Sequence, residues 1–451
     1  MALLTLEKLQ SLAPDPVSQE RAKQCAAPFR WQLLEGTERV LWGEFKTPVD
    51  PFYTAVDLQG PGFKCSCPSR KFPCKHALGL ALMIFQKPDA FSFGNNIPEA
   101  IEKWIAGRDK RKEGISSAAA PSFSEEEKKP EPVTEAKKWT WDMLVAANRL
   151  DDMKQGAYEL NIWLKDLIGR GLASADALNH ENWNFISKRM VDAKLSGIGR
   201  RMRILADRIG QDNWQEMALH EIGQWHLLAG GILKLEHLED LEQMEILQLA
   251  GANVKKDLLM EEPGISDTWQ ILGVSMSMEE SLTARRTWLY GYRSEKFALI
   301  LDFAFGSAPF DVVYKAGTAM EGMVVFYPGT FPIRALVKTR ESVLEDVLPV
   351  KGFKILNQFK NYWKKAIASN PWLSQFPLAL EEVSPVQIEN QWFLADKEGT
   401  AIPCKVEGLS GWKLLSISAG QPFTVFGEWD GKQVLPLAAW QDDNYFELNV
   451  G

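Results

Sequence analysis

The sequence predicts an α+β fold in which a small N-terminal strand–loop–helix module is separated by a linker from a larger C-terminal part. Three observations predict this arrangement: a highly charged stretch early in the chain, helical periodicity of apolar residues after it, and strand-favouring segments in the last third. A length of 451 residues corresponds to about three folded units. We therefore expect a module (1–107), a linker (108–138), a helical region (139–262) and an α+β region with antiparallel strands (263–451).

The composition narrows the class of protein. Apolar residues make up 45% and charged residues 24%, which is an ordinary globular balance. A net charge of −8 argues against a protein coated with cations for nucleic acid, although a local basic patch is compatible with it. Five cysteines are too few for a secreted disulfide scaffold. The first residues lack signal-peptide features and no apolar run is long enough to span a bilayer, so we expect a cytoplasmic protein without a membrane segment.

The N-terminal module is expected to begin with a helix over about residues 6–27. Three strand-like runs follow, and the last alternates apolar and polar residues in the manner of a half-buried strand; they are residues 31–34, 40–45 and 53–58. After the module, residues 108–138 are rich in charge and proline and poor in large apolar side chains. Such a stretch buries too little surface to offset its conformational entropy, so we expect a disordered linker. A flexible linker would let the module fold and unfold independently.

Apolar residues in the helical region recur with a period that draws one stripe along a helix. The first stripe is formed by Met153, Ala157, Leu160, Leu164 and Leu167, and a second by Ile198, Met202, Leu205 and Ile209. We expect helix breaks at Gly197 and at Gly230-Gly231. Short connections between such helices predict an antiparallel bundle.

From about residue 265 the segments become dense in strand-favouring residues, as in 297–303 and 323–327. Residues 397–400 and the pair Asp430-Gly431 each stand between two such runs and predict antiparallel hairpins. One helix, over about residues 356–368, interrupts the strands. The 17 tryptophans are scattered singly, which is typical of core residues rather than of a ligand cage.

One cluster carries recognisable chemistry. Three of the five cysteines and one histidine form the pattern Cys-x-Cys, six residues, Cys-x-His. Three thiolates and one imidazole complete the tetrahedral ligand set of a Zn²⁺ ion and leave no open position, so the sequence predicts one structural zinc held by Cys65, Cys67, Cys74 and His76. The alternatives are a Cys65–Cys67 redox pair or buried free thiols, and neither requires the second pair at matched spacing.

This pattern, preceded by the strand-like Val56-Asp57-Leu58, resembles the SWIM zinc finger, and the stretch from Cys65 to His76 is close to its bacterial, stand-alone form. The resemblance covers about residues 40–90 and implies the same four zinc ligands. It also implies binding of DNA or of proteins, without deciding between them. The phosphate-binding loop of the helicases that carry such fingers is not found in this sequence.

We therefore expect a non-enzymatic interaction protein whose main partner is another protein, with an oligomeric state that the sequence leaves open. The alternative is DNA binding by the basic finger loop, through Lys64, Arg70, Lys71, Phe72 and Lys75. A third class, an enzyme, would need a site in the α+β region, where Asp302 and the pair Arg285-Arg286 are the candidates. We expect no catalytic residues there, because an aspartate at a strand end is more often a turn former.

Overall fold

A computed structural model describes most of the chain. The described residues are 4–48, 50–59, 62–67, 69, 71–94, 96–116, 138–174, 176–279, 282–306, 308–310, 312–344, 347–406 and 410–448. The predicted α+β class is confirmed, with strands and helices in the N-terminal module, a helical bundle and antiparallel sheets in the C-terminal part. Most of the expected linker, residues 117–137, lies outside the described residues.

The N-terminal module is a five-stranded sheet with helices on both faces. Its strands lie in the order β4-β3-β2-β1-β5. The elements are α1 (Leu6–Ser11), α2 (Pro16–Cys25), β1 (Trp31–Gly36), β2 (Val40–Phe45), β3 (Phe52–Asp57), β4 (Gly62–Cys65), α3 (Lys75–Gln86), β5 (Ser92–Phe93) and α4 (Glu99–Ser116). The single helix expected over residues 6–27 is two, because Pro16 begins a new helix that Asp15 caps through its bond from the Ser18 amide.

Helix α4 also changes the interpretation of the linker. It continues to Ser116, so residues 108–116 of the expected linker are helical. Arg108 on this helix is only 1% exposed, which a solvated linker residue would not be. Two of the charges in this part, those of Arg108 and Asp109, form contacts with other segments.

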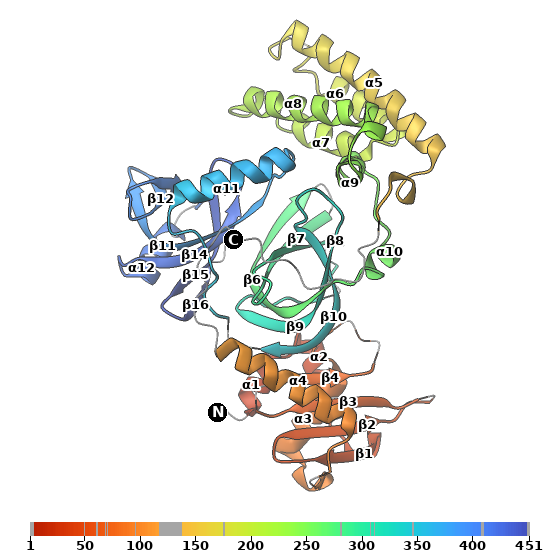
Figure 1. The fold of residues 1–451 in the computed structure, drawn as a ribbon, viewed down its shortest axis with the longest axis vertical. Coiled ribbons are helices and arrows are strands. Elements are labelled where there is room, and N and C mark those ends of the chain that lie inside the picture. Colours follow the sequence, from red (N-terminus) through yellow and green to blue (C-terminus); the bar gives the residue numbers. More distant parts are fainter. Residues whose placement is uncertain are drawn as a thin grey trace.

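The helical region follows as a bundle at one end of the molecule (Figure 1). Its helices are α5 (Ala147–Arg170), α6 (His180–Asp192), α7 (Ser196–Ala206), α8 (Trp214–Leu233), α9 (Asp240–Ala250) and α10 (Lys256–Met260). The predicted stripe on α5 is buried throughout, and so are Ile198, Met202 and Leu205 of the second stripe.

Of the two expected helix breaks, the first lies just before Gly197, because α6 ends at Asp192 and α7 begins at Ser196, whereas the second, at Gly230-Gly231, is wrong. Gly197 lies in the first turn of α7, and Gly230-Gly231 lie inside α8, which continues to Leu233. A Cβ on Gly197 would come 2.1 Å from the Leu249 carbonyl oxygen, and one on Gly231 would come 2.4 Å from Ile246. These glycines are therefore positions where α9 approaches its neighbours closely.

The C-terminal α+β region begins with a closed five-stranded barrel, β10-β8-β7-β6-β9. Its strands are β6 (Ile265–Glu279), β7 (Leu282–Gly291), β8 (Phe297–Phe305), β9 (Thr318–Phe326) and β10 (Arg334–Leu344). β6 pairs with both β7 and β9, and β8 pairs with β10 in parallel. This is a Greek-key barrel with the connectivity of an OB-fold, and its inside is filled by side chains such as Trp269 and Ile300.

The last part of the chain is a six-stranded antiparallel sheet, β13-β12-β11-β14-β15-β16, with two helices. Its elements are α11 (Leu356–Ser369), β11 (Phe376–Ile388), β12 (Gln391–Ala395), β13 (Ala401–Pro403), α12 (Ser410–Ser418), β14 (Phe423–Trp429), β15 (Val434–Gln441) and β16 (Asn444–Glu447). Both predicted hairpins are present. The ring of Phe426 stacks on Phe297 of the barrel at 5.5 Å and meets Trp288 at 6.0 Å, so this sheet covers much of the outer face of β7 and β8.

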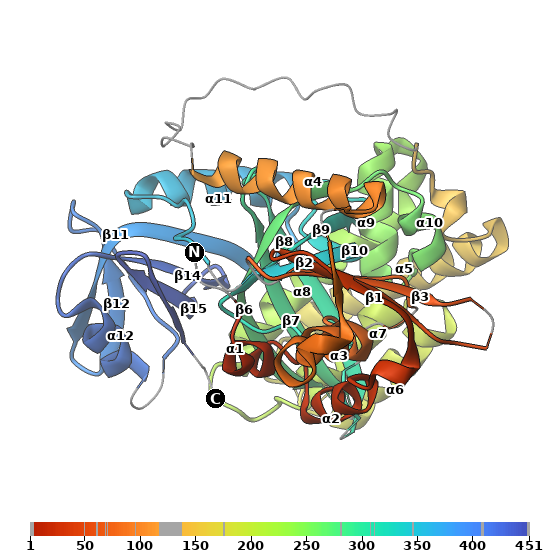
Figure 2. The ribbon, with the colours of Figure 1, turned by 90° about the horizontal axis from the view of Figure 1, so that it is seen from below.

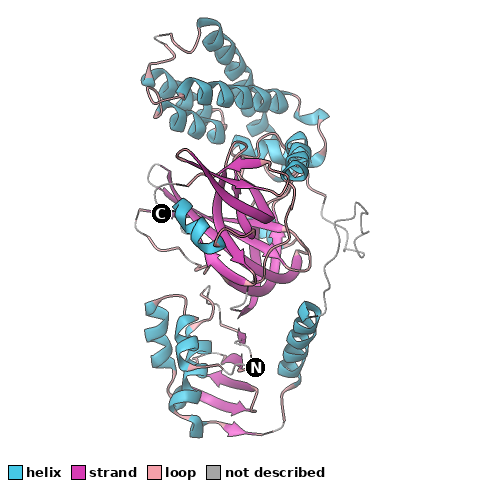
Figure 3. Ribbon diagram, turned by 90° about the vertical axis from the view of Figure 1, so that its left-hand side faces the viewer, coloured by secondary structure: helices cyan, strands magenta, loops and turns pink. Residues whose placement is uncertain are grey.

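The barrel lies between the bundle and the N-terminal module (Figures 1 and 3). Seen from below, the strands of the module lie across the end of the barrel, where β4 contacts β10 (Figure 2). The module is therefore seated on the barrel, in contrast to the independent unit that a flexible linker predicted. Among the described residues, no helix is both long and apolar enough to cross a bilayer.

Candidate metal centre and the adjoining cleft

The four predicted zinc ligands come from one strand end and one helix start. Cys65 is the last residue of β4, and Cys67 follows two residues later. Cys74 is the N-cap of α3, and His76 lies in its first turn. The intervening chain turns back so that the two pairs face each other. The alternating pattern of β3 and β4 and the apolar run of α3 thus place all four side chains at one end of the module.

The geometry fits a tetrahedral metal site. The four ligand atoms all lie within 4.8 Å of one another, and Cys65 Sγ is 3.9 Å from His76 Nδ1. In a zinc tetrahedron with three sulfurs and one nitrogen, neighbouring ligand atoms are about 3.5–3.8 Å apart. Cys74 and His76 are 3% and 4% exposed, so the ion would be shielded on the helix side. The four ligands fill the coordination sphere, and the site is therefore structural.

Several groups around the ligands were not predicted from the sequence. Thr54 Oγ1 lies 3.2 Å from Cys65 Sγ, and the Ala77 amide donates to Cys74 Sγ at 3.5 Å. The rings of Phe45 and Phe52 lie 4.4 Å and 5.2 Å from the His76 imidazole. Of these groups, only Thr54 could have been predicted from the sequence, because antiparallel pairing of β3 with β4 places it directly opposite Cys65. Such outer contacts fix ligand orientation.

The crowded sulfurs control one another's protonation. Hydrogen bonding with Cys67 raises the pKa of the Cys65 thiol to about 11. Hydrogen bonding with Cys65 raises the pKa of Cys74, whereas the same kind of contact lowers the pKa of Cys67. The neighbouring sulfurs are thus the main influence on the pKa of each thiol. A divalent cation removes the competition, because all three thiolates can then share one positive centre.

Comparison with protein families identifies the module. The family model of the SWIM zinc finger matches residues 56–85, which include all four ligands. The chain carries a SWIM zinc finger. A second family model, the SWIM-associated four-helix bundle domain, matches residues 148–250, which correspond to helices α5 to α9. No curated protein matches the chain, and no solved structure does.

The residues expected to contact a partner from the SWIM finger are not all directed to one surface. Lys71 forms an ion pair with Asp15 at 2.8 Å, and Phe72 packs edge-on against Phe63 inside the module. Lys64 is exposed and lines a cleft toward the barrel, as does one side of Phe72. Lys75 is exposed but does not line this cleft. Arg70 lies outside the described residues.

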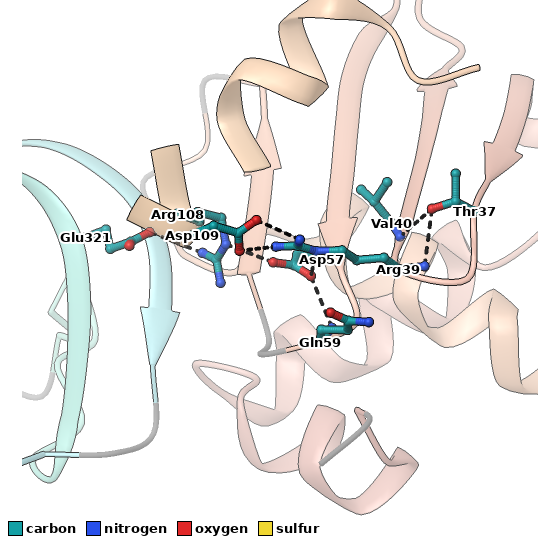
Figure 4. A network of polar contacts seen from close by, with 8 residues as sticks. All are labelled: Thr37, Arg39, Val40, Asp57, Gln59, Arg108, Asp109 and Glu321. Atoms are coloured by element: carbon teal, nitrogen blue, oxygen red, sulfur yellow. Dashed lines mark hydrogen bonds and ion pairs between the residues drawn. The ribbon is translucent and has the colours of Figure 1, made fainter. Parts of the chain in front are cut away.

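A buried ion network fastens the SWIM module to the barrel (Figure 4). Arg108 Nε donates to Asp57 Oδ2 at 3.0 Å, and its Nη1 donates to Glu321 Oε2 of β9 at 3.1 Å. Arg39 pairs with Asp109 on the next position of α4. Gly62 of β4 leaves the room for Arg108, because a Cβ there would come 2.3 Å from the guanidinium carbon. The strand that ends in the first zinc ligand is thus also the strand that Arg108 crosses.

The candidates for an enzymatic site have structural contacts. Asp302 lies within β8 and not at its end, and it accepts from Arg285 Nη2 at 2.6 Å. Arg286 pairs with Glu428 of the C-terminal sheet at 3.0 Å. The two arginines alternate along β7, so they point to opposite faces and do not form one site.

Proposed function

We propose that this chain is a non-enzymatic interaction protein in which a structural zinc holds the SWIM module in shape and the main partner is another protein. The non-enzymatic part is supported by the closed Cys3His set, which leaves no coordination position for a substrate. All five cysteines are free thiols, which suits the reducing cytoplasm that zinc thiolates require.

The observation that carries the protein partner is a set of exposed apolar side chains on two helices of the SWIM-associated bundle, here called the exposed face. Helices α5 and α8 pack against each other, and four large apolar side chains on them are between 50% and 58% exposed: Tyr158, Ile162, Leu219 and Leu227. Between the two leucines, a Cβ on Gly223 would meet nothing within 4 Å, so the surface of α8 is notched. Exposed apolar patches of this kind are typical of protein contacts.

DNA binding by the finger loop alone has less support. One of its cations, Lys71, is already paired, and Phe72 is partly buried, so neither is free to meet a phosphate or a base at the loop tip. Only Lys64 and Lys75 remain as exposed, unpaired cations among the described members of that set.

The test is quantitative affinity capture from an extract of the native host, with the zinc-loaded chain as bait. Ile162→Asp and Leu227→Asp place a charge on the exposed face without touching the core, so both should lose the specific partner while retaining the thermal stability of the protein. Leu241→Asp on α9, which is 45% exposed, is the matched control and should keep it. Equal capture by all three variants would refute docking on this face.

A further inference from the structure

A cleft of about 770 Å³ lies between the SWIM module and the barrel, and neither part forms it alone. One wall comes from β4 and the first turns of α4, and the other from β8, β10 and the loop that precedes β9. The ion pair of Arg108 with Glu321 and the contact of β4 with β10 hold the two walls together. It is separate from the exposed face of the bundle discussed above.

The charge of this cleft is opposite to that of the whole chain. Its lining includes two acidic residues, Asp302 and Glu341, and five cationic ones: Lys64, Lys103, Lys256, Lys338 and Arg340. The charge of Asp302 is compensated by an ion pair with Arg285, a barrel residue that does not line the cleft and is 5% exposed. Among the cations, Lys103 is paired with Glu99 of α4 at 2.5 Å, whereas Lys64 and Lys256 are exposed and have no carboxylate partner in the described part of the chain. The cleft therefore has a local excess of positive charge in a protein whose net charge is −8.

Two hydrogen-bond donors in the lining lack an acceptor. Trp104 is 8% exposed, and its indole Nε1 has no partner among the described residues. Arg340 Nη2 is buried and likewise has none, while the guanidinium lies 4.3 Å from the centre of the Tyr314 ring. Buried donors are normally satisfied, so two of them in one cationic cleft indicate a ligand that supplies oxygen acceptors.

The ligand must also suit aromatic surfaces. Phe72, Trp104 and Tyr314 all line the cleft, and they come from three different segments. Cations that follow a groove, interleaved with aromatic rings, are the combination by which proteins hold single strands of nucleic acid. A duplex does not fit this chemistry, because its bases are already paired and stacked and cannot turn toward an aromatic ring.

We infer that the cleft between the SWIM module and the barrel binds a single strand of nucleic acid. The lysines and Arg340 meet its phosphates, Trp104 Nε1 donates to an oxygen of the strand, and the accessible side of Phe72 contacts a base. The inference concerns a different surface from the proposed protein-docking face, so either can fail without the other.

The test is fluorescence anisotropy of labelled 15-residue oligo-dT and oligo-U with the zinc-loaded full-length chain at 50 to 200 mM salt. With four or five phosphate contacts, log K should fall against log salt with a slope of about −3. Lys64→Gln and Lys256→Gln should each weaken binding about fivefold at 0.1 M salt and reduce the slope by about 0.7. Trp104→Phe should weaken binding about fivefold and leave the slope unchanged, because the lost donor is neutral.

Three controls decide the outcome. Lys188→Gln, on the exposed side of α6, matches the lysine substitutions and should leave binding intact. Ile162→Asp should also bind the strand normally, which separates this site from the bundle face. No binding at 50 mM salt, or an equal loss in Lys188→Gln, would overturn the inference. Equal competition by a poly-glutamate peptide of the same length would overturn it as well, in favour of an acidic protein segment.

Discussion

Arg108 of helix α4 reaches Glu321 of strand β9 across the boundary between the SWIM module and the barrel, with Nη1 and Oε2 3.1 Å apart. The same guanidinium donates to Asp57 of β3, and the three side chains are at most 4% exposed. Arg108 thus bridges two buried carboxylates, one on each side of the boundary, and Arg39 Nε also lies 3.5 Å from Asp57 Oδ1. Because a buried charge without a partner is costly, this contact makes the stability of the module depend on the barrel.

Replacement of Arg108 should therefore be far more damaging than replacement of an exposed arginine. Arg108→Met leaves Asp57 and Glu321 buried without their shared cation, and we expect a loss of about 3–5 kcal/mol of stability. Thermal denaturation measures it. Arg189→Met, which removes an arginine paired with Glu159 on the bundle surface, is the control and should leave the melting temperature unchanged. Similar melting temperatures for the two variants would show that the buried network contributes little.

Gly62→Ala tests the same contact from the other side. The new methyl group would stand 2.3 Å from the guanidinium carbon of Arg108, so the arginine must move away from Glu321. We expect faster hydrogen exchange in β9 and β4 with the zinc content unchanged. Gly94→Ala, where a Cβ meets nothing within 4 Å, should exchange as the wild type does. Unchanged exchange in Gly62→Ala would mean that Arg108 adapts without loss.

Loss of zinc should reduce local stability beyond the SWIM module. Cys74→Ser removes one ligand and the N-cap of α3, so the module should lose its stoichiometric zinc and unfold. From the sequence we expected the rest of the chain to stay unaffected. Because the contact between Arg108 and Glu321 would be lost, we now expect amides of β9 to lose protection while those of the bundle core keep theirs. Hydrogen exchange with mass spectrometry resolves the two regions, and full protection of β9 would restore the original expectation.

Zinc affinity should fall as the pH is lowered. In the metal-free protein the pKa of Cys65 is raised to about 11 and that of Cys74 is raised too, so both are protonated below pH 9, whereas the pKa of Cys67 is lowered. Zinc must displace about two protons, so its affinity should drop about 100-fold for each unit of pH between 9 and 7. Competition with a chelator at several pH values measures this slope, and a slope near zero would contradict three thiolate ligands.

The hydroxyl of Thr54 should support the metal site without binding the metal. It lies 3.2 Å from Cys65 Sγ, and its hydrogen bond opposes the rise that Cys67 causes in the pKa of that thiol. Thr54→Val keeps the shape and removes the hydrogen bond, so we expect zinc affinity to fall about 10-fold or more. Thr54→Ser retains a hydroxyl and should recover most of the affinity. Equal affinities in all three proteins would exclude an outer-shell role.

Local features of the sequence were sufficient for the metal centre and for most elements. The spacing of Cys65, Cys67, Cys74 and His76 is set by ligand chemistry within twelve positions, so it needs no knowledge of distant contacts. The stripe on α5 follows from periodicity, and the strands β2 and β14 follow from strand-favouring residues, and both signals are local. Where local rules failed, a distant partner was responsible: Gly231 indicates a helix break in isolation, yet it is the position where α8 admits Ile246 of α9.

The sequence by itself therefore determined that the chain folds a small module around three sulfurs and an imidazole. Only the tertiary structure decided where that module sits. In the sequence, Arg108 resembles a solvated linker residue. In the folded chain it contacts Asp57 and Glu321, which lie 51 and 213 positions away. The cationic cleft arises in the same way, because its walls are far apart in the sequence. Compensation of a buried charge is a property of the folded whole, and no local pattern encodes it.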